Sequence, residues 1–265
     1  MTDDQAAAAQ EWKRWHEQRN ESVSGPYGLL SLTGTIWLSD HPEGKLPAIP
    51  GSWAEDGDEV VLTATAEDGL TLDGKPFTGE VLLTEDSGPA TDSRLAHGER
   101  RLVVLRREGL WAVRDFDPAA PDRAAFRGIE ATPYDPAFVV PGQFTAYDES
   151  RVVKVGNADG RERGLGLGGE LAFTFGGARR TLQVTVEADG ALWAVFADAT
   201  SGNGSYRFRF LRPGVPDAEG RVTVDLNRAL LPPCAFADHF LCPFPPPGNT
   251  LAVAVEAGER NRRGR

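Results

Sequence analysis

The sequence predicts a mainly β protein: an antiparallel sandwich or barrel-like packed sheets, with one N-terminal helix. Three observations lead to this prediction. A single strong helical pattern stands at the start of the chain, short runs of β-forming residues follow it, and Asp-Gly or Gly-Gly pairs separate several of these runs. No second helix of comparable quality appears, which argues against repeated βαβ units and a wound parallel sheet.

The N-terminal helix is predicted over residues 3 to about 22. Asp3 or Asp4 can cap its first turn, where negative charge suits the helix dipole. Gly25-Pro26 ends the pattern. The apolar stripe has three- to four-residue spacing and consists of Ala7, Ala8, Trp12 and Trp15. We expect the two tryptophans to dock the helix on the sheet.

After the helix, the hydrophobic period changes to two. The segment from Leu30 to Leu38 alternates apolar and other residues, as a strand with one buried face does. Further predicted strands are Val60–Thr65, Val81–Thr84, Leu102–Arg106, Leu110–Arg114, Phe138–Tyr147, Arg151–Val155, Leu171–Phe175, Thr181–Val186, Leu192–Phe196, Tyr206–Leu211, Val222–Leu226 and Leu251–Val255. The predicted tight turns are Asp68-Gly69, Asp73-Gly74, Asp159-Gly160, Gly176-Gly177 and Asp189-Gly190.

The chain of 265 residues is predicted to form one mostly β domain over residues 1–265. Prolines gather over residues 117–141, as in a connection between two sheets or two subdomains. We prefer one domain because this stretch keeps aromatic residues that can pack. A Pro-rich segment at 232–247 is expected to close the fold, and the basic tail 258–265 is expected to be a frayed, solvated terminus.

The composition narrows the classes of partner. A formal net charge of −11 disfavours nucleic acid and anionic membranes. The N-terminus has no apolar signal region, and no apolar run is long enough to span a bilayer. We therefore expect a soluble, cytoplasmic protein without nucleic-acid or membrane partners. The oligomeric state stays open.

Known chemical motifs are largely absent from the sequence. It contains neither a G-x-S-x-G elbow nor a Walker A loop. The four histidines lack zinc-site spacing, so we predict neither a metal nor a cofactor. The Gly-rich stretch RGLGLGGE, at 163–170, does not lead from a strand into a helix. It favours a flexible β connection over a dinucleotide site.

Cys234 and Cys242 are the only cysteines, and they leave several possibilities open. A zinc half-site with His239 lacks a second ligand pair. A disulfide is possible across so short a loop, but a reducing cytosol disfavours it. A catalytic thiol needs a base or a positive charge, and Arg228 is a candidate for the charge. Buried, inert thiols are the leading interpretation.

The densest polar stretch runs from Asp198 to Arg228. If its strands pair, Arg209 and Asp225 meet on one face. Such a pair forms either a buried ion pair that fixes the sheet or a polar pocket for an anionic ligand. The candidate ligand-binding residues are Asp198, Ser201, Tyr206, Arg209, Asp225, Asn227 and Arg228.

The same stretch carries a resemblance to a known family. VFADATSGNGSYRFRFL and VTVDLNRALLPPCAFADHFLCPFPPPGNTLAVAVEAGE resemble the C-terminal signature of domain-of-unknown-function family 1684. LLSLTGTIWL and VRDFDPAAPDRAAFRGIEATPYDPAF resemble its other segments. Leu230 and Leu231 stand where the family pattern has Tyr-Asn, which removes two polar groups. The matched positions are Asp198, Thr200, Ser201, Gly202, Tyr206, Arg209, Phe210, Asp225, Asn227, Arg228, Pro233, Cys234, Cys242, Pro243 and Asn249. The resemblance implies candidate positions and no reaction.

Three functions remain as hypotheses. The first is binding of a small polar or anionic ligand in a cleft of the C-terminal strands, in which case Arg209→Ala abolishes binding and spares the fold. The second is a structural or protein-interaction domain whose ion-pair network loses stability in the same variant. The third is a hydrolase that uses Ser201 or Cys234 with a base still to be found.

Overall fold

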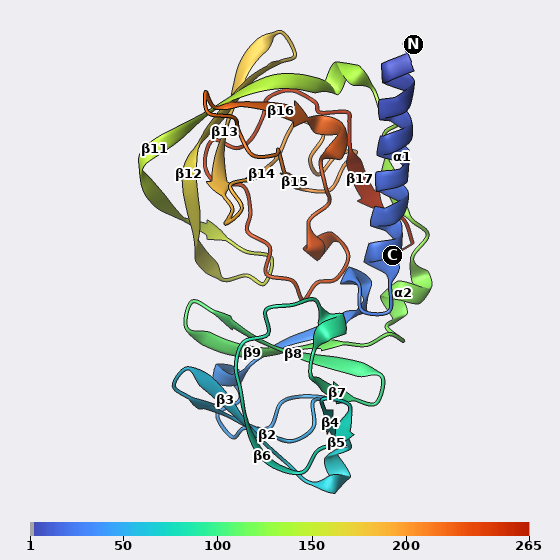
Figure 1. Ribbon diagram of the computed structural model, residues 1–265, viewed down its shortest axis with the longest axis vertical. Coiled ribbons are helices and arrows are strands. Elements are labelled where there is room, and N and C mark those ends of the chain that lie inside the picture. The colour runs from blue at the N-terminus through green and yellow to red at the C-terminus, as the bar shows by residue number, and fades with distance from the viewer. Residues whose placement is uncertain (1–2, 265) are drawn as a thin grey trace. The chain divides into compact units, whose positions relative to one another are not determined.

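The computed structural model describes residues 3–264, and its architecture is mainly β with one long N-terminal helix, as predicted (Figure 1). The backbone groups into two compact units. Unit 1 runs up to Asn20 and resumes at Arg127, and unit 2 is Glu21–Phe126. The second boundary falls inside the proline-rich stretch that was expected to be a connection. The single-domain assignment stays a prediction.

The N-terminal helix α1 spans Asp3–Ser24, with Asp3 and Asp4 in its first turn. Trp12 is buried, and its indole N–H donates to the carbonyl of Asn227 at 2.8 Å. Its ring stacks on His16 with centroids 5.3 Å apart. Trp12 therefore docks the unit 1 part of the helix on the backbone of Asn227 rather than on a strand. Trp15, the other tryptophan expected to dock the helix, is only half-buried. No helix in the described part of the chain is long and apolar enough to cross a membrane.

Unit 2 contains two antiparallel sheets around one apolar core, which includes Trp53, Leu62 and Trp111. The larger sheet has the order β1 (Leu32–Trp37), β9 (Leu110–Phe116), β8 (Arg100–Arg107), β7 (Leu95–His97), β4 (Leu70–Leu72) and β5 (Lys75–Pro76). The smaller sheet has the order β2 (Ser52–Asp56), β3 (Glu59–Ala64) and β6 (Gly79–Leu83). A short helix α2 covers Pro121–Ala125.

Unit 1 contains a curled six-stranded sheet that forms a half-barrel (Figure 1). Its inner face holds a second core, which includes Leu171, Phe196 and Val224. The strand order is β15 (Arg209–Leu211), β14 (Leu192–Phe196), β13 (Ala178–Val186), β12 (Glu162–Phe175), β11 (Val139–Gly156) and β16 (Arg221–Asp225). A separate ribbon pairs β10 (Ile129–Ala131) with β17 (Glu259–Arg262).

Two of the predicted turns show why their residues were informative. Asp73-Gly74 joins β4 to β5, and both residues have positive φ, 51° and 73°. Gly176-Gly177 joins β12 to β13 with φ of 60° and 73°. Glycine adopts this left-handed backbone without a Cβ penalty, and Asp tolerates it as a single residue, so both pairs suit short hairpins.

The structure corrects several local expectations. Of the predicted strand Tyr206–Leu211, only Arg209–Leu211 forms a strand. Leu251–Val255 is irregular, because its backbone groups bond to Ala197, to Ala199 and to side chains. The Gly-rich stretch 163–170 lies inside the long strand β12, where it is paired to β11. The tail is not frayed as far as residue 264, because β17 pairs with β10. Arg265 lies outside the described residues.

Candidate functional site

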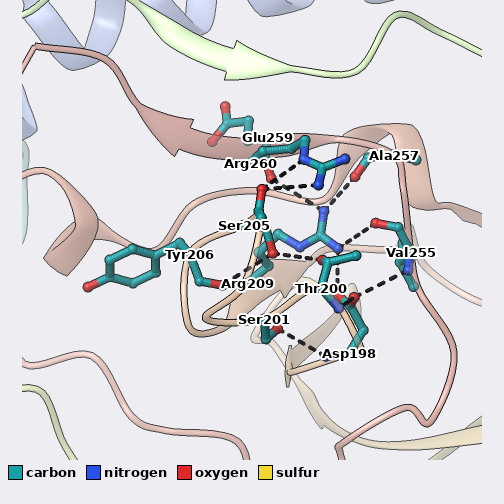
Figure 2. Close-up of polar contacts among 11 residues, drawn as sticks. Asp198, Thr200, Ser201, Ser205, Tyr206, Arg209, Val255, Ala257, Glu259 and Arg260 are labelled. Carbon is teal, nitrogen blue, oxygen red and sulfur yellow. Dashed lines mark hydrogen bonds and ion pairs between the residues drawn. The ribbon is translucent and has the colours of Figure 1, made fainter.

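Arg209 lies in strand β15 at the centre of a buried polar network (Figure 2). Its guanidinium is fully buried, and its Nη2 atom bonds to Oδ2 of Asp198 at 2.6 Å. Asp198 lies two residues after the end of β14, and its side chain is fully buried as well. The pair is therefore an internal salt bridge, withdrawn from any ligand in solution.

The remaining hydrogen bonds of this guanidinium hold residues 255–259, which we call the C-terminal segment. Nη1 donates to the carbonyls of Ala257 and Glu259, and Nη2 also donates to the carbonyl of Val255 at 2.8 Å. The other carboxylate oxygen of Asp198 accepts from the N–H of Val255 at 3.2 Å. The Arg209–Asp198 ion pair thus supplies hydrogen-bond partners for the backbone of residues 255–257, which a neighbouring strand would supply in a regular sheet.

Burial and pairing oppose each other in the titration of this pair. Burial raises the pKa of Asp198, but the charge of Arg209 and the N–H of Thr200 outweigh burial and lower it overall. Burial lowers the pKa of Arg209, and Asp198 opposes that effect. We therefore assign both side chains to their charged forms, because each one stabilises the ionised form of the other.

The expected pairing of Arg209 with Asp225 is wrong. Their strands, β15 and β16, lie at opposite ends of the six-strand order and do not pair with each other. Asp225 instead bonds to Asn227 at 2.9 Å and to Arg228 at 3.4 Å. Strand order is a long-range property, and sequence proximity of two strands did not determine it here.

Asp225, Asn227 and Arg228 form a second cluster that anchors α1. The Asn227 side chain is fully buried and bonds in both directions to the backbone of Asp135, at 3.0 Å each. Arg228 bonds to Glu11 on α1 at 2.7 Å. Arg228 was the sequence candidate for a positive charge beside Cys234, and the structure places Arg207 there instead. The structure brings these three predicted residues together, but as a helix anchor apart from the Arg209 pair.

Ser201 lies in the turn after β14, where its Oγ accepts from the N–H of Asp198 at 3.0 Å. Among residues 3–264, no carboxylate or imidazole is recorded in a hydrogen bond with this hydroxyl. Thr200 and Ser205 bond to each other at 2.8 Å in the same turn. These contacts shape the turn, and they supply no base for a nucleophilic serine.

Tyr206 points away from the Arg209 guanidinium (Figure 2). Its hydroxyl donates to the carbonyl of Cys234 at 3.1 Å and lies 3.6 Å from the Cys234 sulfur. Arg207 is exposed, with its guanidinium 4.6 Å from the centre of the Phe244 ring. The predicted residue Tyr206 thus belongs to a thiol cluster with Cys234, Cys242 and Arg207.

A groove lies on the outer face of the half-barrel, and we call it the β16 groove. Its volume is about 840 Å³. Strand register places its floor residues on one face: Thr174 pairs with Arg179, and Gln143 pairs with Ala172 and with Arg221. The loop after β15 forms the wall. The lining residues are Pro141, Gly142, Gln143, Ala172, Phe173, Thr174, Arg179, Gly214, Val215, Asp217, Arg221, Val222 and Thr223.

Two arginines line the β16 groove, Arg179 and Arg221, and they differ in whether a carboxylate pairs with them. Arg221 bonds to Asp217 at 2.7 Å and to Glu219 at 2.8 Å. The hydrogen bonds from Arg221 lower the pKa of Asp217, so this pair stays ionised well below neutral pH. Arg179 is exposed, and no ion pair or hydrogen bond of its side chain is recorded among residues 3–264. Among its described lining residues, the groove therefore offers one guanidinium that is available to an anion.

Sequence reasoning missed Arg179, although a signal for it was present. The Gly176-Gly177 turn was predicted, and a two-residue turn fixes the register of its hairpin. That register places Thr174 opposite Arg179 on one face. The loop that covers this face carries no comparable sequence signal.

The fold and these clusters define a mainly antiparallel β protein whose C-terminal segment is held by the buried side chain of Arg209. The sequence matches the family described as "Protein of unknown function (DUF1684)" over residues 124–260, more than half of the chain, and the chain belongs to that family. The family assignment therefore confirms the resemblance that we found in the sequence.

One solved structure with similarity to the chain is the solution NMR structure of an uncharacterised protein from Haloarcula marismortui. The two sequences are 32% identical over an alignment that covers 52% of this chain and 78% of that one, with a TM-score of 0.44. No curated protein matches the chain.

Proposed function

We propose that the protein binds a small ligand with a carboxylate or phosphate group in the β16 groove. The observation that carries this proposal is Arg179, an exposed guanidinium that has no partner among residues 3–264 and lines a cavity of about 840 Å³. Cavities of this order, roughly 300–1,000 Å³, are typical of small-molecule sites. A guanidinium fork binds a carboxylate or phosphate through two parallel hydrogen bonds.

The other lining groups suit a ligand with a polar head and an apolar body. Thr174 lies across the strand from Arg179, so its hydroxyl supports hydrogen bonding to the same head group. Pro141, Ala172 and Val215 add apolar walls. As in our first hypothesis, the ligand is polar or anionic and a C-terminal strand, β16, lines its site. The charged residue that binds it is now Arg179 instead of Arg209.

An NMR titration tests the proposal. Benzoate, acetate and inorganic phosphate are added separately to the ¹⁵N-labelled protein, and amide shifts are followed in the groove. We expect saturable shifts at residues such as Ala172 and Thr223, with benzoate the tightest carboxylate because its ring covers the apolar walls.

Arg179→Ala should weaken this binding by at least about tenfold, since a charge-assisted hydrogen bond contributes about 1.5–3 kcal/mol. The matched control is Arg107→Ala, which removes the same charge from an exposed position on β8 that does not line the groove. Shifts that stay linear in the wild type, or that saturate equally in Arg179→Ala, would count against the proposal.

For Asp198 and Arg209 we propose the structural role that was our second hypothesis. Their complete burial supports it, because every ligand contact would require opening of the C-terminal segment. An uncompensated buried charge costs about 3–5 kcal/mol, so neither partner is dispensable for folding.

A further inference from the structure

Cys234 and Cys242 lie side by side in the Pro-rich segment of unit 1. The N–H of Cys234 donates to the sulfur of Cys242 at 3.2 Å, and the two thiol side chains also interact with each other. Neither residue forms a disulfide. Both are buried, with exposed fractions of 3% and 5%. The structure therefore holds two reduced thiols as close neighbours.

The surroundings of Cys234 favour its thiolate. The Cys242 thiol, the Tyr206 hydroxyl and the Arg207 guanidinium all interact with the Cys234 sulfur. The hydrogen bond with Cys242 is the largest cause, and together with the other two it outweighs burial and lowers the pKa of Cys234 to about 7. Burial and the neighbouring sulfur raise the pKa of Tyr206, so the hydroxyl keeps its proton and remains a donor.

We propose that Cys234 and Cys242 form a hydroperoxide-sensitive dithiol, in which Cys234 is oxidised first and Cys242 closes the disulfide. The geometry carries this proposal: the buried Cys234 sulfur has a hydroxyl donor at 3.6 Å, and the sulfur of Cys242 accepts from the Cys234 N–H at 3.2 Å. The burial selects the oxidant, because a hydroperoxide is small, whereas a disulfide reagent must align three sulfur atoms in a buried site.

The oxidation takes place in two steps. The Cys234 thiolate attacks one oxygen of the hydroperoxide, the O–O bond breaks, and the leaving oxygen takes a proton to give water or an alcohol with a sulfenic acid. The Cys242 sulfur then attacks the sulfenic sulfur, the S–O bond breaks, and water leaves as the disulfide forms. Two thiols are oxidised, and one hydroperoxide is reduced.

Mass spectrometry of the intact, folded protein tests this proposal with hydrogen peroxide as the oxidant. We expect the wild type to lose two hydrogen atoms and to yield a peptide that links Cys234 to Cys242. In Cys242→Ser we expect a sulfenic acid at Cys234, trapped by dimedone, because the resolving thiol is absent. In Cys234→Ser we expect no comparable adduct at position 242.

Tyr206→Phe provides a readout on the cluster itself. Loss of the donor should slow disulfide formation roughly three- to tenfold, because a less stabilised sulfur is less often a thiolate. The matched control is Tyr27→Phe, because the hydroxyl of Tyr27 donates to the carbonyl of Glu99 and not to a cysteine. The proposal is overturned if the folded protein keeps both thiols under peroxide that oxidises the urea-unfolded chain. Equal dimedone labelling of the two cysteines in the single variants, or linkage only between molecules, would overturn it too.

Discussion

Arg209 shows how far one buried side chain can determine a local fold. It has three carbonyl partners and one carboxylate partner, all supplied by Asp198 and by the C-terminal segment. Asn249 acts in the same way, since its amide bonds to the backbone of Gln183 and Val195. Both residues match the family pattern, and both bind backbone. These two matches in the C-terminal signature are therefore explained by folding.

Cys234 gives a prediction about pH. Its folded-state pKa of about 7 lies below the ordinary value of 9.0, so the native state releases the proton first. Its contribution to stability is therefore present above pH 9 and is lost as the pH falls through 7. The free energy of unfolding gained between these limits is up to about 3 kcal/mol. Urea denaturation under reducing conditions at pH 6 and at pH 9 measures the difference.

The control for this prediction is Cys234→Ala, which removes the titrating group. Its free energy of unfolding should rise less between pH 6 and pH 9 than that of the wild type. An equal rise in both proteins would show that Cys234 titrates with its ordinary pKa.

Strand β12 was predicted only in part from the sequence. The residues 171–175 were predicted as a strand, but the strand begins at Glu162 and includes the Gly-rich stretch. These glycines have different neighbours. A Cβ on Gly169 would lie 2.5 Å from the carbonyl oxygen of Thr145 and would overlap the Phe144 ring, whereas a Cβ on Gly166 would meet nothing within 4 Å. Close approach of the backbone, rather than flexibility, explains Gly169.

We therefore predict opposite effects for two alanine substitutions in this strand. Gly169→Ala should lower the free energy of unfolding by about 1–3 kcal/mol, because the new methyl group clashes with paired backbone. Gly166→Ala should be neutral or stabilising by up to about 1 kcal/mol, because it reduces the freedom of the unfolded chain. Urea denaturation of both variants checks this, and equal destabilisation would contradict the assignment.

The limits of sequence reasoning follow from the range of each signal. Turns and alternating strands are local, and they were predicted from pairs such as Gly176-Gly177. The Arg209–Asp198 pair depends on how the C-terminal segment returns to the sheet, and the β16 groove depends on the path of the loop after β15. Both are long-range properties. For that reason the predicted residue set contained Arg209 with the wrong partner and omitted Arg179.

At the scale of the whole molecule, each unit has its own core, with Trp111 in one and Phe196 in the other. The division between the units passes through α1, which is one continuous helix from Asp3 to Ser24. Because both units contribute residues to this helix, we propose that they unfold together, as the single-domain prediction implies.

Calorimetry tests this proposal. The wild type should show one transition whose van 't Hoff and calorimetric enthalpies agree. Trp111→Ala and Phe196→Ala should each lower that single midpoint, since large-to-small core changes cost about 3–5 kcal/mol. Two peaks, with each variant shifting a different one, would instead identify two independent domains.

We propose a division of roles between two arginines, in which Arg209 holds the fold and Arg179 binds the ligand. Urea denaturation with and without benzoate, at about ten times its dissociation constant, tests both roles in one measurement. The wild type should gain about 1.4 kcal/mol from benzoate. Arg179→Ala should keep its stability to within about 0.5 kcal/mol and lose that gain. Arg209→Ala should lose about 3–5 kcal/mol. The milder variant Arg209→Lys should retain the gain from benzoate. A stable Arg209 variant that has lost the benzoate effect, beside an Arg179 variant that keeps it, would contradict the account.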